Sequence, residues 1–224
     1  MDGNGRWAKA RHRPRVFGHQ EGVKTVRRIV EDAADMGIKY LTLYSFSTEN
    51  WTRPKAEVAA LFQLLKKYVI DDLETLNKNN VRVRIIGSRE GLSDDLLETI
   101  NRVETVTRAN SEFFLNVAFN YGGRNEIIRA MQRAGEAGHD LADIDETILG
   151  QYLDTAGLPE PELIIRTSGE RRVSNFLTWQ TAYSEFVFTD VLWPDFSRRD
   201  LEKAIAEFQT RERRFGNLNK DEVA

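Results

Sequence analysis

The stretch Tyr40-Leu41-Thr42-Leu43-Tyr44-Ser45-Phe46 is rich in aromatic and aliphatic side chains and is bounded by polar residues, as β-strands are. Residues 81–86, 113–119, 163–165 and 186–188 have the same character. Segments with a helical spacing of apolar residues lie between or beside these runs, at 22–36, 57–76, 93–108, 125–134, 144–153 and 200–211. Strands separated by helices of this length need crossover connections. The sequence therefore predicts an α/β fold with a mainly parallel sheet.

The composition is that of one folded domain spanning residues 1–224, because 41% of the residues are hydrophobic and no linker or repeat interrupts the chain. A net charge of −3 argues against a general nucleic-acid-binding surface, so we expect no nucleic-acid partner. The absence of cysteine excludes disulfides and thiolate metal sites. No apolar run approaches the ~18 residues that span a bilayer, and no signal-peptide pattern is present, so we expect a soluble, cytoplasmic protein.

The first residues, Met1-Asp2-Gly3-Asn4-Gly5-Arg6-Trp7, combine an acid, two glycines, an amide and an arginine. Glycines let backbone N–H groups approach a ligand, an arginine binds phosphate oxygens and an aspartate can hold a divalent cation. The alternative is a flexible terminus. The spacing Gly3-x-Gly5-x-x-Ala8 also fits a loose dinucleotide-binding pattern, but the bulky Arg6 and Trp7 and the helix-breaking Pro14 argue against it.

Polar clusters follow three of the expected strands, where ligands of parallel sheets usually bind. Residues 47–54 mix hydroxyls, an acid, an amide, an indole and a guanidinium, and form either a site loop or only a helix entry. Residues 120–125 hold two glycines, which suit a turn and a ligand site equally well. Residues 166–175 interleave three arginines with hydroxyls, which favours phosphate binding over a solvated basic loop.

Two further features leave alternatives open. Glu185 precedes a short apolar run and is either a surface charge at a strand end or a metal ligand. The apolar stripe of the 57–76 helix is either ordinary core or the wall of an elongated pocket, and its members are Val58, Leu61, Leu64, Leu65 and Tyr68.

Taken together, these motifs resemble those of the cis-prenyltransferases, in particular the bacterial undecaprenyl diphosphate synthases. The resemblance covers essentially the whole chain and rests on residues 1–8, 18–19, 46–51, 120–124, 166–170, 174–176, 193–196 and 211–216. It implies a homodimer, a six-stranded parallel sheet surrounded by helices, and a hydrophobic tunnel. In that family an apolar strand precedes Met-Asp-Gly, and the printed sequence begins at Met1, so we expect the first strand to be missing here.

The resemblance also implies the chemistry. Isopentenyl diphosphate would be condensed repeatedly onto farnesyl diphosphate, with a Z double bond formed at each step, to give a long-chain product such as undecaprenyl diphosphate, a cell-wall lipid carrier. Asp2 would bind Mg²⁺ and act on the allylic diphosphate, with Glu185 as the second acidic group at the metal. The allylic diphosphate would be held by Gly3, Asn4, Gly5, Arg6, Arg15 and His19, beside Trp7.

Isopentenyl diphosphate would be bound by the 166–175 loop, through Arg166, Arg172, Val173 and Ser174. The loop that joins the two substrates would comprise Ser47, Thr48, Glu49, Asn50, Trp51 and Arg53, with Asn50 at the position treated as the proton acceptor. Arg214 and Gly216 match a C-terminal motif that reaches the partner subunit's site. The product would be delivered to the inner face of the membrane.

A second hypothesis is a non-catalytic scaffolding subunit of a prenyltransferase complex, which would keep the fold and the dimer face. Such a subunit is expected to have lost Asp2 or the arginine-hydroxyl loop. Both are present in this sequence, which favours the enzyme.

Overall fold

A computed structural model describes residues 1–212 of the chain and contains five strands in that range. Strands β1 (Tyr40–Ser47), β3 (Phe113–Tyr121) and β2 (Val81–Ile86) form a parallel sheet in the order β1-β3-β2, in which Leu43 and Ile85 both lie opposite Val117. Strands β4 (Leu163–Arg166) and β5 (Glu185–Phe188) form a second parallel sheet. All five strands that the apolar runs predict are present.

The expectation of a single six-stranded sheet is wrong for the described residues, which form one sheet of three strands and one of two. Strand β4 pairs with β5, and β1 pairs with β3. Within residues 1–212, no strand pairs with both β1 and β4, so no ladder of hydrogen bonds joins the two sheets. Packed side chains join them instead: Ile86 of β2 and Ala118 of β3 lie in one buried cluster with Ile164 of β4. Thr167, which follows β4, accepts a hydrogen bond from the Asp2 backbone N–H at 2.9 Å, which connects the start of the chain to the smaller sheet.

The α-helices of the described chain are α1 (Asn4–Ala10), α2 (Arg15–Asp35), α3 (Lys55–Lys78), α4 (Asp94–Val106), α5 (Gly123–Glu136), α6 (Glu146–Tyr152) and α7 (Arg198–Gln209). Six of them correspond to the helices expected from periodicity. Helix α1 was not expected, and α2 begins seven residues before the predicted start. Pro14 occupies the N-cap of α2, where its missing N–H costs no helical hydrogen bond, so it starts this helix.

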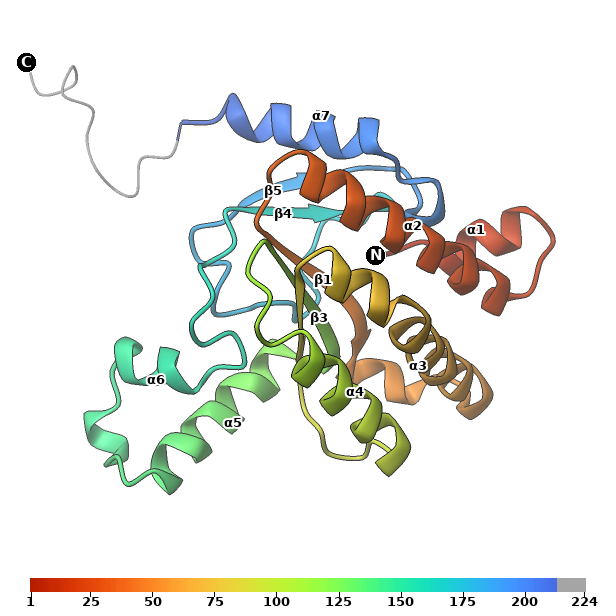
Figure 1. Ribbon diagram of the computed structural model, residues 1–224. Helices are drawn as coiled ribbons and strands as arrows, with labels where there is room; N and C mark the ends of the chain where they lie inside the picture. Colours follow the sequence, from red (N-terminus) through yellow and green to blue (C-terminus); the bar gives the residue numbers. More distant parts are fainter. Residues whose placement is uncertain (213–224) are drawn as a thin grey trace, which may run out of the picture.

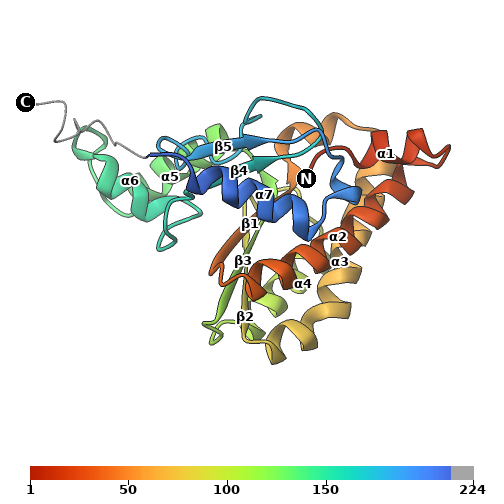
Figure 2. The same cartoon turned by 90° about the horizontal axis from the view of Figure 1, so that it is seen from above.

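Helices α2, α3 and α4 lie on one face of the β1-β3-β2 sheet, and α7 lies beside β4 and β5 (Figures 1 and 2). The main core lies between this sheet and the three helices, with Ile29 of α2, Leu73 of α3 and Ile100 of α4 all buried. Helix α1 lies at the opposite end of the molecule from α5 and α6 (Figure 1). None of the helices within residues 1–212 is both long enough and apolar enough to cross a bilayer.

Candidate functional site

A cavity of about 1890 Å³ runs along β1, between the β1-β3-β2 sheet and helices α2 and α3, and reaches β4 and β5. The first residues of the chain, the 47–53 segment and the 166–175 loop contribute polar side chains to it. The body of the cavity is apolar, because α3 contributes Leu61, Leu64 and Leu65 and the far ends of the strands contribute Phe113 and Leu115. Leu61 and Leu65 of the α3 stripe pack against the core, and together with Leu64 they also line the cavity. Both interpretations of this stripe therefore apply.

Asp2 lies at the polar end of this cavity and is bound to the loop after β4. Arg166 donates to the Asp2 carboxylate oxygen Oδ2 from Nε at 3.0 Å and from Nη2 at 2.8 Å. Arg166 also donates to the hydroxyl of Ser174 at 2.9 Å and to the backbone carbonyl of Arg172. Nearly half of the Asp2 side chain is exposed, so its second carboxylate oxygen is accessible to a ligand in the cavity.

A second carboxylate bridges two of the arginines that the sequence assigns to different substrates. Glu170 lies 3.3 Å from the guanidinium of Arg6 and 2.5 Å from that of Arg172. Arg6 also donates to the backbone carbonyl and the hydroxyl of Ser168. The two expected diphosphate-binding arginines therefore lie on either side of one anionic group. A guanidinium that pairs with a carboxylate can also pair with a phosphate, because both acceptors suit its planar fork of donors.

Glu57, near the start of α3, gathers three cationic or titratable side chains of the site. Its Oε1 lies 3.2 Å from Arg15, 3.2 Å from Arg53 and 3.6 Å from His19 Nε2. Partial burial raises the pKa of Glu57, but the hydrogen bond and charge of Arg15 and the charge of Arg53 outweigh it and lower the pKa. Burial lowers the pKa of His19 despite the nearby Glu57 carboxylate, which favours the neutral imidazole. Gly5 lets the Arg15 guanidinium come close, because a Cβ at this position would lie 2.8 Å from it and would displace it.

The segment after β1 is a short 3-10 helix, η1 (Thr48–Thr52), whose side chains point to different places. Asn50 lines the main cavity, and its Oδ1 accepts a hydrogen bond from the Ser47 backbone N–H at 3.1 Å. Thr48 and Trp51 line a second, smaller cavity of about 310 Å³ beside β3. The Trp51 indole N–H donates to Asn120 Oδ1 at 2.7 Å. Two of the residues expected in the substrate loop thus face away from the main cavity.

The cavity brings together most of the residues that the sequence predicts for the site. Those that line it are Asp2, Gly3, Asn4, Gly5, Arg6, Arg15, His19, Ser47, Glu49, Asn50, Arg53, Arg166, Arg172, Val173 and Ser174. Trp7 is outside it, stacks on Phe17 and donates from its indole to Asp195 at 2.6 Å. Arg214 and Gly216 lie outside the described residues.

Glu185, like Trp7, Thr48 and Trp51, is a predicted site residue that does not line the main cavity. It begins β5 opposite Leu163, whereas Arg166, which contacts Asp2, lies at the other end of this parallel pair opposite Phe188. The two ends of the pair are three residue steps apart, which is about 10 Å along the strand. Glu185 pairs instead with Arg211 at 2.8 Å. The fold of one chain therefore does not bring Glu185 to Asp2, and its role at a metal stays a prediction.

The chemistry of the donors fits Mg²⁺, although the described residues hold no cluster of three acidic or histidine side chains. Mg²⁺ commonly takes one or two carboxylates and completes its shell with substrate phosphates and water. Asp2 offers one partly exposed carboxylate at the cavity end where the arginines gather. A magnesium ion held by Asp2 together with a diphosphate is consistent with this donor set.

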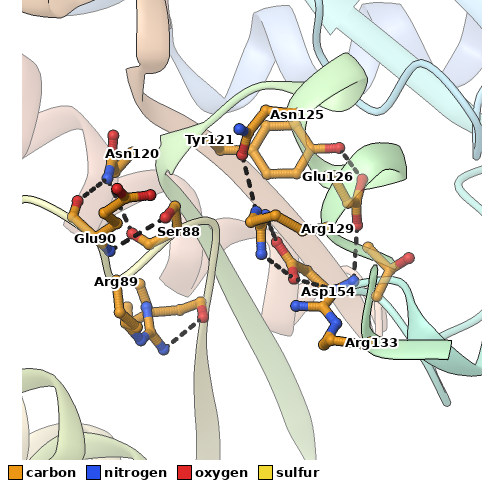
Figure 3. Close-up of polar contacts among 12 residues, drawn as sticks. Ser88, Arg89, Glu90, Asn120, Tyr121, Asn125, Glu126, Arg129, Arg133 and Asp154 are labelled. Carbon is orange, nitrogen blue, oxygen red and sulfur yellow. Dashed lines mark hydrogen bonds and ion pairs between the residues drawn. The ribbon is translucent and has the colours of Figure 1, made fainter. Parts of the chain in front are cut away.

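Sequence reasoning missed a buried polar cluster around Glu126, on α5. Glu126 is fully buried and accepts hydrogen bonds from the Tyr121 hydroxyl and from the backbone N–H of Asp154, the latter at 2.9 Å. Figure 3 shows Arg129 and Arg133 converging on the Asp154 carboxylate from the same helix. The cluster connects Glu126, in the first turn of α5, to Asp154, which follows α6. The pattern Glu126-x-x-Arg129-x-x-x-Arg133 is its only sequence signal, and it is typical of many exposed helices.

Comparison with known proteins identifies the family. Residues 1–216 match the family model described as putative undecaprenyl diphosphate synthase. An isoprenyl transferase of Caulobacter vibrioides is 54% identical over 228 residues, covering all of this chain and 88% of the relative. Isoprenyl transferase 2 of Bradyrhizobium diazoefficiens is 53% identical over 222 residues, covering 97% of this chain and 88% of the relative.

Two solved structures have the same fold. Lavandulyl diphosphate synthase from Lavandula x intermedia, in complex with dimethylallyl diphosphate, has a TM-score of 0.92 and 35% identity, covering 97% of this chain and 95% of that one. A probable undecaprenyl diphosphate synthase from Campylobacter jejuni has a TM-score of 0.79 and 40% identity, covering 88% of this chain and 93% of that one. The family expected from the sequence motifs is confirmed: the chain belongs to the undecaprenyl diphosphate synthase family of prenyltransferases.

Proposed function

We propose that the protein is a Mg²⁺-dependent cis-prenyltransferase that condenses isopentenyl diphosphate repeatedly onto farnesyl diphosphate and forms a Z double bond at each step. The observation that carries this proposal is the shape and polarity of one cavity. Arginines and Asp2 gather at its polar end, and about 1890 Å³ of mainly apolar space continues from it. This arrangement suits substrates with a charged diphosphate head and a hydrocarbon tail.

The polar end supports the charge separation that the reaction requires. Breaking the allylic carbon–oxygen bond leaves negative charge on the departing diphosphate and positive charge on carbon. Arg6 and Arg15 would stabilise the departing diphosphate, and Arg166 and Arg172 would bind isopentenyl diphosphate, whose carbon–carbon double bond attacks the cation. Mg²⁺, held by Asp2, supplies Lewis-acid neutralisation of the diphosphate when it is bound. Asn50 would occupy the position of the proton acceptor.

The apolar end would hold the growing chain. Each CH₂ group that leaves water contributes about 0.8 kcal/mol, so a C5 unit contributes about 4 kcal/mol when it is fully buried. The α3 stripe and Phe113 supply the apolar wall. We propose that the apolar part of the cavity, which this wall lines, is the tunnel expected from the family. The product would be a long-chain polyprenyl diphosphate such as undecaprenyl diphosphate, and its length would be set by the space available.

Three further parts belong to the proposal. The protein would act as a homodimer, with Arg214 and Gly216 reaching the partner's site. The Glu185 carboxylate would bind the metal only in an arrangement different from the one within a single chain, where Glu185 is not close to Asp2. The product would be released to the inner face of the membrane as a carrier for cell-wall precursors, from a cytoplasmic enzyme.

The test is incubation of the purified protein with Mg²⁺, farnesyl diphosphate and radiolabelled isopentenyl diphosphate, followed by chromatography of the products. We expect a long-chain product that disappears when EDTA replaces Mg²⁺. Asp2→Ala provides the matched inactive control. Absence of any elongated product from the wild-type protein would refute the enzyme and favour the scaffolding subunit.

A further inference from the structure

Asn175 lies where three loops meet, each of which follows a strand of the fold. Its side-chain Nδ2 donates to Glu49 Oε1 at 2.8 Å, in the segment after β1. Its Oδ1 accepts from the backbone N–H of Arg124 at 2.9 Å, at the start of α5 after β3. Asn175 itself belongs to the loop after β4, next to Ser174. One carboxamide therefore contacts both of the other loops.

The backbone at this junction is shaped to allow these contacts. Asn175 has a φ of 63°, in the left-handed region that asparagine tolerates better than most residues. Its carbonyl accepts from the Gly123 backbone N–H at 2.7 Å, so Asn175 satisfies two of the free N–H groups at the start of α5. A Cβ at Gly122 would lie 2.8 Å from Asn175 Nδ2 and 2.5 Å from Thr48 Oγ1. Gly122 thus has a packing role at this junction.

A chain of contacts leads from Glu49 to Asp2. Asn175 is adjacent to Ser174, whose hydroxyl accepts from Arg166 at 2.9 Å, and Arg166 is paired with Asp2. Partial burial raises the pKa of Glu49, but the hydrogen bond from Asn175 and those from its own segment lower it below its usual range. Glu49 is therefore an ionised acceptor near neutral pH, and its bond to the Asn175 amide is charge-assisted.

We propose that Asn175 is a positioning residue: its carboxamide anchors Glu49 to the start of α5 and so aligns the 48–53 segment with the loop that carries Arg166 and Ser174. This inference rests on the proposed prenyl transfer and adds to it how the two substrate loops are held in register. Asn175 also lines the cavity, but its carboxamide nitrogen and oxygen are engaged by Glu49 and by the Arg124 backbone, so it acts through Glu49.

A polarity swap tests the contact. Asn175→Asp keeps the oxygen that caps α5 but places a carboxylate against Glu49. We expect kcat/KM for isopentenyl diphosphate to fall by at least about 10-fold, the size of effect expected for a lost hydrogen bond to a charged group. In the double variant Asn175→Asp, Glu49→Gln the bond can re-form with reversed polarity. We expect this variant to recover to within about 3-fold of Glu49→Gln alone, as a direct contact requires.

Two controls separate positioning from general damage. Asn101→Asp adds the same charge on an exposed face of α4 and should leave turnover unchanged. Thermal unfolding of each variant shows whether it folds, and KM for farnesyl diphosphate should stay unchanged, because the 166–175 loop holds the other substrate. A purely structural role for Asn175 would lower the melting temperature, and Glu49→Gln would not restore activity.

The outcomes distinguish this inference from the proposed function. Recovery of isopentenyl diphosphate turnover in the double variant supports the positioning role. An active wild-type enzyme in which Glu49→Gln fails to rescue Asn175→Asp, or in which Asn175→Asp is fully active, overturns the inference and leaves the proposed function standing. A wild-type protein that elongates no prenyl chain overturns both.

Discussion

Replacing Phe113 with alanine is expected to lengthen the prenyl product. Phe113 is 3% exposed, begins β3 opposite Val81 and lines the cavity. Ser47, beside the polar end, lies opposite Tyr121 at the other end of β3, so eight residue steps, or about 26 Å, separate Phe113 from that end. The ring therefore occupies space that a long chain reaches last.

The size of the effect follows from the volume that the ring vacates. A phenyl ring holds slightly more carbon than one isoprene unit, so its removal makes room for roughly one further C5 unit. Burial of that unit contributes about 4 kcal/mol. The substitution also costs the empty enzyme about 3–5 kcal/mol of folding free energy, because a cavity replaces packed atoms. We therefore expect a longer product from a less stable enzyme.

The assay is chromatography of the products made from farnesyl diphosphate and radiolabelled isopentenyl diphosphate. The matched control is Phe114→Ala, because the Phe114 ring stacks on Tyr40 at 4.6 Å outside the cavity. Ser45, which lies at an irregularity of β1 and lines the cavity, gives the opposite test: Ser45→Leu should shorten the product. Unchanged lengths in Phe113→Ala and Ser45→Leu, or equal lengthening in Phe114→Ala, would mean that the tunnel lies elsewhere.

Three further predictions concern the polar residues. Asp2→Ala should abolish turnover but lower the melting temperature only modestly, because Asp2 is 45% exposed and Arg166 keeps its bonds to Ser174 and to the Arg172 carbonyl; near wild-type kcat with Mg²⁺ would contradict the role of Asp2. Arg166→Ala and Arg172→Ala should chiefly raise KM for isopentenyl diphosphate, and a raised KM for farnesyl diphosphate alone would exchange the two phosphate sites. Asp154→Asn should destabilise the fold by about 1.5–3 kcal/mol at pH 7 in urea unfolding. Burial raises the pKa of Asp154, but Arg129 and Arg133 outweigh this effect and lower the pKa. The difference in free energy of unfolding between the variant and the wild type should therefore be largest above the pKa of Asp154 in the unfolded chain, and it should decrease below about pH 4. A difference that is independent of pH would show that the charge of Asp154 is not responsible.

The elements of the fold and the positions of the site loops could be predicted from local sequence. Alternation of apolar runs and helical stripes located all five described strands, because strand and helix periodicities are set within a few residues of chain. The polar clusters at 47–54, 120–125 and 166–175 follow strands, and parallel strands place their carboxyl ends at one edge. The residue types of the glycine-rich start left a phosphate site and a flexible terminus open, and the resemblance to the family favoured the phosphate site; in the structure these residues line the cavity.

Pairing between distant segments was decided only by the tertiary structure. The division into two sheets depends on which strand edges meet, and local periodicity does not specify edge partners. The choice of Phe113 over Phe114 for the cavity depends on which face of β3 meets α3, since alternation alone leaves both possible. In the Glu57 cluster, Arg15 and Glu57 are 42 residues apart in the sequence. The hydrogen bond between Asn175 and Glu49 joins side chains that are 126 residues apart. Such contacts depend on the packing of whole elements, which is why sequence motifs could identify the family and the loops while the structure was needed to show how the loops are held.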